Sequence, residues 1–141
     1  MEFRANDWRS VLPEGWEDRS LITIVGATGP SGIAANIVVT REPVDARTSI
    51  EEYAAQQKQV SFEQFPDLEV LDERATRLNG APAYQRLQRI GWQNRTLQQA
   101  QTFVLGRGAV YVITCTAAVD EFNAAIPAFR QFTENFLLEE R

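Results

Sequence analysis

The second half of the chain consists of strand-like segments separated by glycine turns, and this pattern constrains the fold most. Segments 68–78, 81–95, 96–105 and 109–119 are rich in β-branched or aromatic residues, or alternate apolar and polar side chains. Asn79-Gly80 is a strong signal for a tight hairpin turn, and the glycines at 106 and 108 mark another turn. Short turns join neighbouring strands, so the pattern predicts a four-stranded antiparallel meander.

The first half of the chain predicts a hairpin followed by a helix. The segments "LITIVGA" (21–27) and "IAANIVVTRE" (33–42) have strand composition and are joined by "TGPSG". A Thr48-Ser-Ile-Glu51 capping-box pattern then opens a helix that runs to about Phe65 and is stopped by Pro66. In the first strand, Leu21, Thr23 and Val25 alternate with Ile22 and Ile24, and the isoleucines form the purer core face.

The C-terminal segment 120–138 predicts a second helix. Its apolar positions follow helical spacing, with Pro127 tolerable only in the first turn; they are Phe122, Ile126, Phe129, Phe136 and Leu137, with Thr133 in the same stripe. The order β-β-α-β-β-β-β-α predicts an α+β fold in one domain, 1–141. We expect a twisted antiparallel sheet of about six strands with two helices packed on it.

Composition argues against nucleic acid as a partner. The formal net charge of the 141 residues is −5, Lys58 is the only lysine, and no basic run stands out. The N-terminus lacks a signal-peptide pattern, and the longest apolar run, 109–119, is too short to span a bilayer. We therefore expect a cytoplasmic protein that does not insert directly into membranes.

The sequence offers little for catalysis. It has no histidine, which removes the commonest general base and most zinc and iron sites. "GATGPSG" (26–32) lacks the lysine of a phosphate loop and is better explained as a hairpin loop, and the acidic residues have no metal-loop spacing. Cys115 is the only cysteine and lies in an apolar strand, so a buried thiol is expected. We predict a protein that is not an enzyme and uses no cofactor or metal.

Glutamines occur where a plain core would carry apolar residues. In the strand 96–105, Gln99 and Gln101 alternate onto the same face as Leu97, Phe103 and Leu105. In the first helix, Gln57 lies in a stripe with Ile50, Tyr53, Ala54, Ser61, Gln64 and Phe65. Any one of these amides could be exposed at a rim or bonded to nearby backbone. Together they predict an apolar surface with hydrogen-bonding groups, which suits transmembrane helices, since these pack through close contacts and polar side chains.

Several segments, in the same order through about 10–138, resemble the Eag chaperones of bacterial type VI secretion. The matching segments are "LPEGWEDRSLITI", "ANIVVTRE", "YAAQQ", a proline after the helix, "NGAPAYQ" and "LQQAQTFV". These chaperones belong to the DcrB-like group, whose fold is related to that of PsbP. The resemblance implies a cytoplasmic homodimer that shields the N-terminal transmembrane helices of an Rhs or PAAR-type effector until the effector is loaded onto the secretion spike.

The resemblance also assigns the residues that contact the effector helices. They fall on the first two strands, the first helix and the glutamine strand: Leu21, Thr23, Asn36, Thr40, Gln57, Phe65 and Gln101. Gln57 and Gln101 keep the amide of the family, Asn36 and Thr40 keep polar character, and Thr23 departs from the aliphatic residue that a relative can have there. By this assignment Gln101 faces a guest helix, whereas Gln98, on the opposite face of its strand, does not.

Two other functions remain open from the sequence. The first is a non-catalytic, DcrB- or PsbP-like structural or assembly factor of the cell envelope or of a photosynthetic membrane. The absence of an export signal and of a lipobox cysteine counts against it. The second, more distant, is a small-molecule enzyme or carrier on the same fold, for which a deep closed pocket would be needed.

Overall fold

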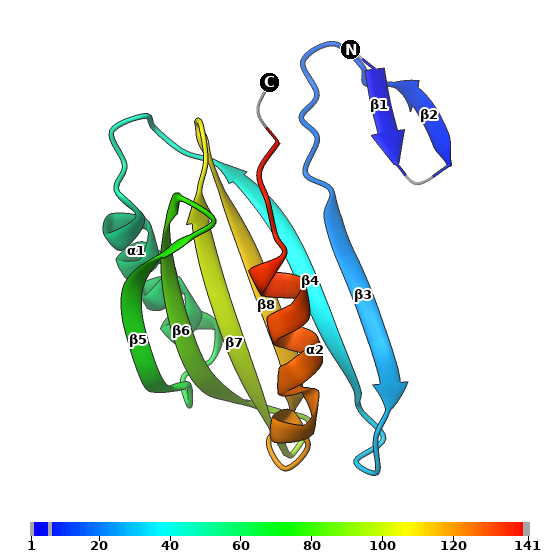
Figure 1. The fold of residues 1–141 in the computed structure, drawn as a ribbon, viewed down its shortest axis with the longest axis vertical. Coiled ribbons are helices and arrows are strands. Elements are labelled where there is room, and N and C mark those ends of the chain that lie inside the picture. The colour runs from blue at the N-terminus through cyan, green and yellow to red at the C-terminus, as the bar shows by residue number, and fades with distance from the viewer. Residues whose placement is uncertain (1, 6, 140–141) are drawn as a thin grey trace.

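A six-stranded antiparallel sheet forms the centre of the molecule in the computed structural model, which describes residues 2–5 and 7–139 (Figure 1). The spatial order is β3-β4-β8-β7-β6-β5. In chain order the strands are β3 (Leu21–Thr28), β4 (Ala34–Pro43), β5 (Glu69–Leu78), β6 (Ala81–Trp92), β7 (Arg95–Leu105) and β8 (Ala109–Ala118). The predicted α+β class and the meander β5 to β8 are confirmed. The β3–β4 hairpin joins the meander through the pairing of β4 with β8.

Turn chemistry accounts for the hairpins of the meander, including one that the sequence analysis missed. Asn79 and Gly80 both have positive φ, 48° and 86°, as the predicted tight turn requires. Gln93 and Asn94 also have positive φ, 49° and 62°, and they end β6, so the predicted strand 81–95 is wrong at its C-terminal end. Without glycine this turn was hard to recognise; asparagine, which tolerates the left-handed region, was its one signal.

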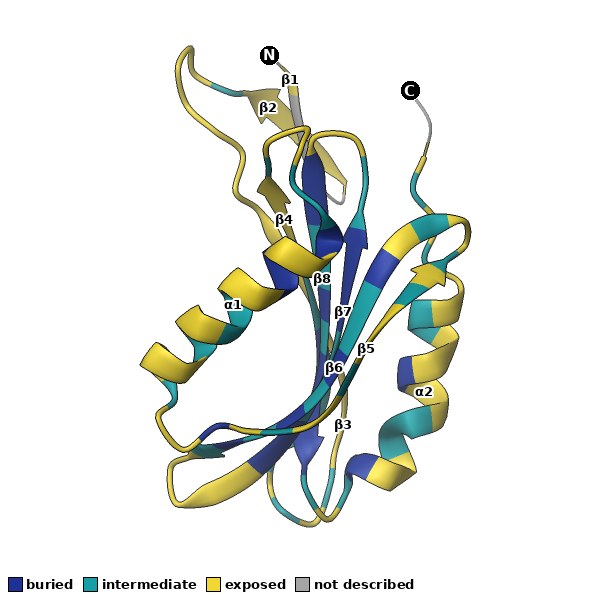
Figure 2. Ribbon diagram, turned by 90° about the vertical axis from the view of Figure 1, so that its left-hand side faces the viewer, coloured by how far each residue is buried: buried dark blue, intermediate teal, exposed yellow. Residues whose placement is uncertain are grey.

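The two helices cover opposite faces of the sheet. Figure 2 shows the sheet between them, with α1 (Ile50–Gln64) on one side and α2 (Phe122–Glu134) on the other. We call the two sides the α1 face and the α2 face. Under α1, Ile50, Tyr53 and Ala54 pack with Phe103 and Val110. The cluster under α2 consists of Phe122, Phe129, Ile37, Val104, Ile113, Cys115 and Ala117. The central strands β7 and β8 are therefore buried on both sides.

Helix α1 begins one residue later than the capping-box pattern predicts. Ser49 is the N-cap, and its hydroxyl accepts a hydrogen bond from the backbone N–H of Glu52 at 3.1 Å. The helix ends at Gln64, just before Phe65 and Pro66, as predicted. Its three buried residues all lie between Ile50 and Ala54. Figure 2 shows why: α1 is inclined to the sheet, and its C-terminal end lies farther from the strands.

Helix α2 differs from its prediction at two points. It ends at Glu134, so Phe136 and Leu137 follow the helix instead of belonging to it. Pro127 is its sixth residue and lies beyond the first turn, where only the first turn had been expected to tolerate it. The missing N–H leaves the carbonyl of Asn123 without its usual intrahelical donor, and Asn123 is exposed, so water replaces that donor at low cost.

Two short N-terminal strands were not predicted. β1 (Glu2–Ala5) and β2 (Trp8–Val11) form a separate two-stranded antiparallel sheet, which we call the arm. Figure 1 shows the arm beyond the β3 edge of the main sheet, past the end at which β3 begins. Four-residue strands carry too weak a pattern to recognise in sequence.

The loop between β3 and β4 is a plain hairpin connection, as expected. It is held to the start of α2 by Glu121, whose carboxylate accepts hydrogen bonds from the Ser31 hydroxyl at 2.6 Å and the Ser31 N–H at 3.1 Å. A side chain at Gly29 would collide with that carboxylate, because a Cβ there would lie 2.4 Å from its Oε1.

The expectation that Ile22 and Ile24 form a core face is wrong. All eight residues of β3 are exposed; Ile22 and Ile24 expose 60% and 43% of their surface, and Leu21 and Val25 expose 59% and 62%. Alternation alone cannot show that a strand lies at the edge of a sheet, beyond the reach of both helices. β3 pairs only with β4 among the described residues.

Candidate functional site: the open part of the α1 face

The strand register brings the predicted sheet residues together on the α1 face. Cross-strand partners share a face, so each row of partners can be followed across the sheet. Leu21 pairs with Thr40. The next row runs Thr23, Val38, Thr114, Gln101 and Arg86, and the third runs Val25, Asn36, Thr116, Gln99 and Gln88. Three adjacent rows thus mix aliphatic, hydroxyl and amide groups. That these residues bind a helix stays a prediction.

The two predicted residues outside the sheet belong to α1 and its C-terminal end. Gln57 is half-buried, and its Nε2 donates to Glu42 Oε2 at 3.3 Å. Tyr53 donates its hydroxyl proton to the same carboxylate, and burial together with that carboxylate raises the pKa of Tyr53. Phe65 packs on the cluster of Leu68, Ile90 and Leu97, which lies at the end of the α1 face opposite the Ile50 cluster.

Two short hydrogen-bond chains connect the amides of the face. Gln88 Nε2 donates to Gln99 Oε1 at 2.8 Å, and Gln99 Nε2 donates to Thr116 Oγ1 at 3.2 Å. Gln101 Nε2 donates to Thr114 Oγ1 at 3.4 Å. The carbonyl oxygens of Gln88 and Gln101 are buried and have no hydrogen-bond partner in the part of the chain that the structure describes. Such an oxygen costs about 1–3 kcal/mol when it stays unpaired, and a donor from outside the sheet reaches it only if the glutamine side chain turns outward.

The remaining predicted residues lie on β3 and β4. Leu21 and Thr23 are exposed, and Asn36 and Thr40 are half-buried. The Asn36 side chain makes only a long hydrogen bond, from Nδ2 to the Ala34 carbonyl at 3.5 Å. This part of the α1 face lies outside the cluster that α1 covers. Its polar groups are therefore available to a partner.

Besides Arg86, four polar residues of these rows were not among the predicted binding residues: Gln88, Gln99, Thr114 and Thr116. The two threonines follow Val110 and Val112 at every second position of β8, so they share the face of the valines. That alternation was a usable signal, although the strand looked apolar throughout. Gln88 had no such signal, because its place opposite Gln99 depends on the missed turn at 93–94.

A buried arginine under α1 is the other residue that sequence reasoning missed. Arg86 is only 2% exposed, and its Nη2 donates to the Ala54 carbonyl of α1 at 2.7 Å. Its guanidinium carbon lies 5.3 Å from the ring centre of Phe103. Desolvation lowers the pKa of Arg86, while Glu73, whose Oε1 is 3.8 Å from Nε, opposes that change. Arg86 therefore ties α1 to the sheet.

Glu73 on β5 completes this cluster. Lys58 Nζ donates to Glu73 Oε2 at 2.5 Å, and the Tyr84 hydroxyl donates to Oε1 at 2.7 Å. These two hydrogen bonds, the lysine's first, hold the pKa of Glu73 below its ordinary value. The cluster joins β5, β6 and α1, which fits a structural role better than a catalytic one.

The α2 face differs in its polar contacts. Gln98 lies on this side, is buried, and its Oε1 accepts from Arg89 Nε at 3.0 Å, so this amide is satisfied within the protein. A cleft of about 680 Å³ lies between β4 and the end of α2, with Ile37, Phe132 and Phe136 in its lining. None of the predicted binding residues lines this cleft.

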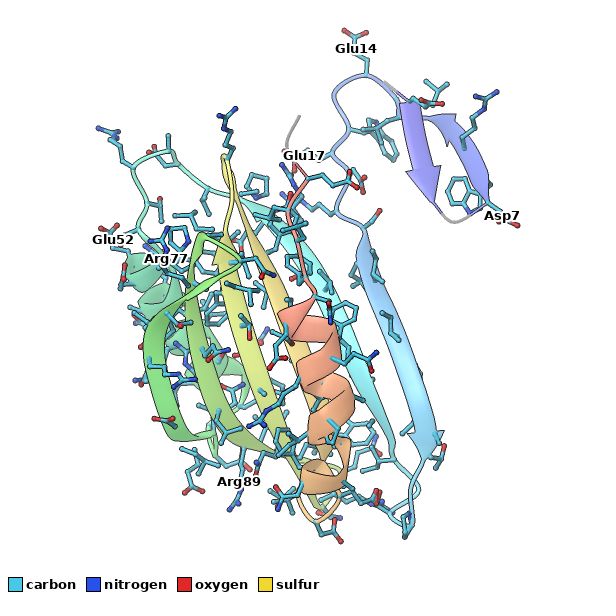
Figure 3. All side chains as sticks on the ribbon, viewed as in Figure 1. Asp7, Glu14, Glu17, Glu52, Arg77 and Arg89 are labelled. Carbon is cyan, nitrogen blue, oxygen red and sulfur yellow. The ribbon has the colours of Figure 1, made fainter. Side chains whose placement is uncertain are left out.

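Within residues 2–5 and 7–139, no group of three or more cysteine, aspartate or glutamate side chains is placed to hold a metal ion. No helix in the same ranges is long and apolar enough to cross a membrane. Figure 3 shows side chains ending in nitrogen or oxygen around β5, whereas β3 carries mainly carbon.

Comparison with solved structures shows the same fold in three proteins. A Pseudomonas aeruginosa protein of unknown function, described as a putative regulator, has a TM-score of 0.86 and 21% identity, covering 100% of this chain and 98% of its own. The cyanobacterial PsbP (CyanoP) of Synechocystis has a TM-score of 0.61 and 12% identity, with coverage of 93% and 86%. LpqN of Mycobacterium tuberculosis, involved in cell envelope biogenesis, has a TM-score of 0.53 and 17% identity, with coverage of 86% and 85%.

Comparison with protein families identifies the family of this chain. No curated protein sequence matches the chain. The sequence profile of the DcrB family matches residues 11–134, which include the main sheet and both helices. The chain therefore belongs to the DcrB family.

Proposed function

We propose that this protein is a cytoplasmic, non-catalytic chaperone that binds the N-terminal transmembrane helices of a type VI secretion effector of the Rhs or PAAR type. It would keep these helices soluble until the effector is loaded onto the secretion spike. Membership of the DcrB family and the resemblance to Eag chaperones support the proposal. The binding site is the part of the α1 face that α1 leaves open.

One observation carries the proposal. Next to the apolar side chains of the α1 face lie two buried carbonyl oxygens, of Gln88 and Gln101, that have no donor among the described residues. A transmembrane helix brings apolar area, whose burial yields about 25 cal/mol per Å². Hydroxyl or amide side chains on that helix can donate to the two oxygens once the glutamine side chains turn toward it, as such groups do between neighbouring helices in a membrane. The face thus offers both kinds of contact that such a helix needs.

The test is co-expression with N-terminal fragments of candidate effectors, followed by purification without detergent. We expect a soluble complex that contains the transmembrane segment, with its mass measured by light scattering. A fragment from which the hydrophobic segment has been deleted serves as the control and should not be captured. Failure to capture any hydrophobic segment would contradict the proposed function.

A matched pair of glutamine variants locates the binding face. Gln101→Ala removes one of the acceptor oxygens, and we expect effector affinity to fall about 2- to 10-fold, the value of one ordinary hydrogen bond. The free energy of unfolding of the effector-free protein should change by less than ~0.5 kcal/mol, since the Gln101 amide makes only a long hydrogen bond to Thr114. Gln85→Ala is the control: Gln85 lies on β6 toward the α2 face and accepts from Arg74. Equal losses of affinity in both variants would contradict the assignment of the face.

A second candidate is a structural or assembly factor of the cell envelope. Its support is the fold shared with LpqN, a protein involved in cell envelope biogenesis. Under this function the protein would associate with envelope components and would capture no effector fragment in the co-expression test. The two candidates are therefore separated by the same experiment.

A further inference from the structure

The α1 face of the sheet is covered unevenly. Helix α1 lies over β6 and β7, so the α1 face of β3, β4 and β8 extends beyond it. On the opposite face of these strands, Ile37, Ile113 and Cys115 are buried under α2. Their neighbours on the α1 face, Val38 and Thr114, are only half-buried. The three rows of cross-strand partners described above contain no charged residue on β3, β4 or β8, so this surface suits an uncharged partner.

One flank of α1 forms a side wall for this surface. Gln57 donates to Glu42 of β4, whereas Lys58 donates to Glu73 of β5, so the two flanks of the helix face opposite edges of the sheet. Val60 follows Gln57 by three residues and therefore shares the flank toward β4; it exposes 45% of its surface. Figure 2 shows that α1 rises from the sheet toward its C-terminal end, so this flank stands above the strands. We call the surface of the three rows on β3, β4 and β8, together with this flank, the channel.

The channel has the size of one transmembrane helix. Three strands spaced about 4.8 Å apart measure about 10 Å between their outer axes, and a helix is about 10–12 Å across. β4 and β8 have ten residues each and are therefore about 33 Å long, while the hydrocarbon core of a bilayer is about 30 Å thick. Figure 1 shows α2 lying along β4 and β8 on the other face, so the twist of these strands accommodates a helix in this direction.

Polar groups recur along the channel with a fixed spacing. Thr40, Thr114 and Asn36 lie in three successive rows, and all three are half-buried. Among the described residues, the Thr40 side chain makes no hydrogen bond and the Thr114 hydroxyl donates none. Successive rows are about 6.7 Å apart, which is two residues of a strand. Residues four apart in a helix lie on one face, about 6.0 Å apart along the axis, so they match two successive rows.

We propose that the guest helix lies in the channel along β4 and β8, against the Val60 flank of α1, and presents hydroxyl or amide side chains at positions i and i+4. These two side chains bond to two of the three polar rows, and the aliphatic residues around them pack on Val38, Val112 and Val60. The inference rests on the proposed function, and it specifies the sequence pattern and the orientation of the partner that this function requires.

The first test varies the guest. A designed segment of about 20 leucine and alanine residues is fused to a soluble carrier protein and co-expressed with this chain. One version has two serines four positions apart at its centre; the control has two serines two positions apart, which lie on opposite faces of the helix. The two versions have the same composition and the same hydropathy. In purification without detergent, we expect capture of the first version to be about fivefold greater, the value of one hydrogen bond.

Each outcome of this test has a distinct meaning. Equal capture of the two versions would overturn the inferred spacing and leave the proposed function intact. Capture of neither version, when a natural effector fragment is captured, would also overturn the inference alone. If no hydrophobic segment of any kind is captured, the proposed function itself is contradicted.

The second test varies the wall of the channel. Val60→Asp places a charge on the flank toward β4, and Phe62→Asp places the same charge on the flank toward β5, since Phe62 follows Lys58 by four residues. Both side chains are exposed, 45% and 40%, so both variants should fold, which their urea midpoints check. We expect Val60→Asp to lower capture of the first designed segment at least about tenfold, because its charge is buried against an apolar helix. Phe62→Asp should capture it like the wild type.

The matched pair also states what would refute the wall. Two folded variants with equal losses of capture, or a folded Val60→Asp variant that captures the segment like the wild type, would overturn the placement of the guest against this flank. The co-expression test of the proposed function uses the wild type alone, so its result is independent of these variants.

Discussion

The two edge strands of the main sheet, β5 and β3, differ in charge and in their contacts with the rest of the chain. β5 is charged along its length and is tied to α1 through Glu73, Lys58 and the buried Arg86. β3 is uncharged, is exposed on both faces, and lies outside the clusters under either helix. The first edge is held by charged contacts within the chain, whereas the second leaves its apolar side chains exposed. An edge strand therefore has to be judged by its charge as well as by its position.

The largest expected effect is the difference in stability between a variant near the β5 edge and one on β3. Arg86→Ala should lower the free energy of unfolding by about 3 kcal/mol, because it removes the bond to the Ala54 carbonyl, the contact with half-buried Glu73 and the packing on Phe103. Ile24→Ala on β3 should cost less than ~0.5 kcal/mol, because this side chain is exposed. Urea unfolding followed by tryptophan fluorescence measures both. Similar costs for the two variants would remove the contrast between the edges.

A smaller effect concerns pH and the β5 edge. The pKa of Glu73 is lowered in the folded protein, chiefly by Lys58, so its contribution to stability is present above its ordinary value of 4.5. The contribution is lost as the pH falls through the lower pKa of the folded state. The difference in urea midpoint between wild type and Glu73→Gln should therefore be constant near neutral pH and shrink in acid. A difference independent of pH would show that Glu73 acts through packing alone.

The smallest effect tests whether a change at the β3 edge reaches the core. Burial raises the pKa of the Cys115 thiol to about 11, so almost no thiolate is present at neutral pH. Labelling of Cys115 by a thiol reagent should be slow in the native protein and equally slow in Ile22→Lys/Ile24→Lys. Rapid labelling of that variant alone would mean that the edge contributes to core stability.

Local signals in the sequence predicted most elements because turns and caps act over a few residues. Asn79 and Gly80 adopt the positive φ angles that their hairpin turn needs, and the cap of α1 is Ser49, one residue after the predicted Thr48. The alternation in β7 correctly separated Gln101 from Gln98, since successive side chains of a strand point to opposite faces. The same logic could have added Thr114 and Thr116 to the candidate face.

Long-range features were not predictable in this way. Ile22 and Ile24 looked like core residues, but a strand's own pattern does not say how many layers cover it. Arg86 carries a charge, so its type alone suggests an exposed residue. It is buried in the structure because Phe103 of β7, Glu73 of β5 and helix α1 surround it. The arm escaped notice because each of its strands has only four residues.

The sequence by itself determined the α+β class, the meander, the alternation of its side chains and the family resemblance, since all of these depend on neighbours along the chain. Only the tertiary structure decided that the helices cover opposite faces, that the polar rows cross five strands on the α1 face, and that β3 is an uncovered edge. These facts depend on strand order and on where the helices reach, and both are set by packing between segments far apart in sequence.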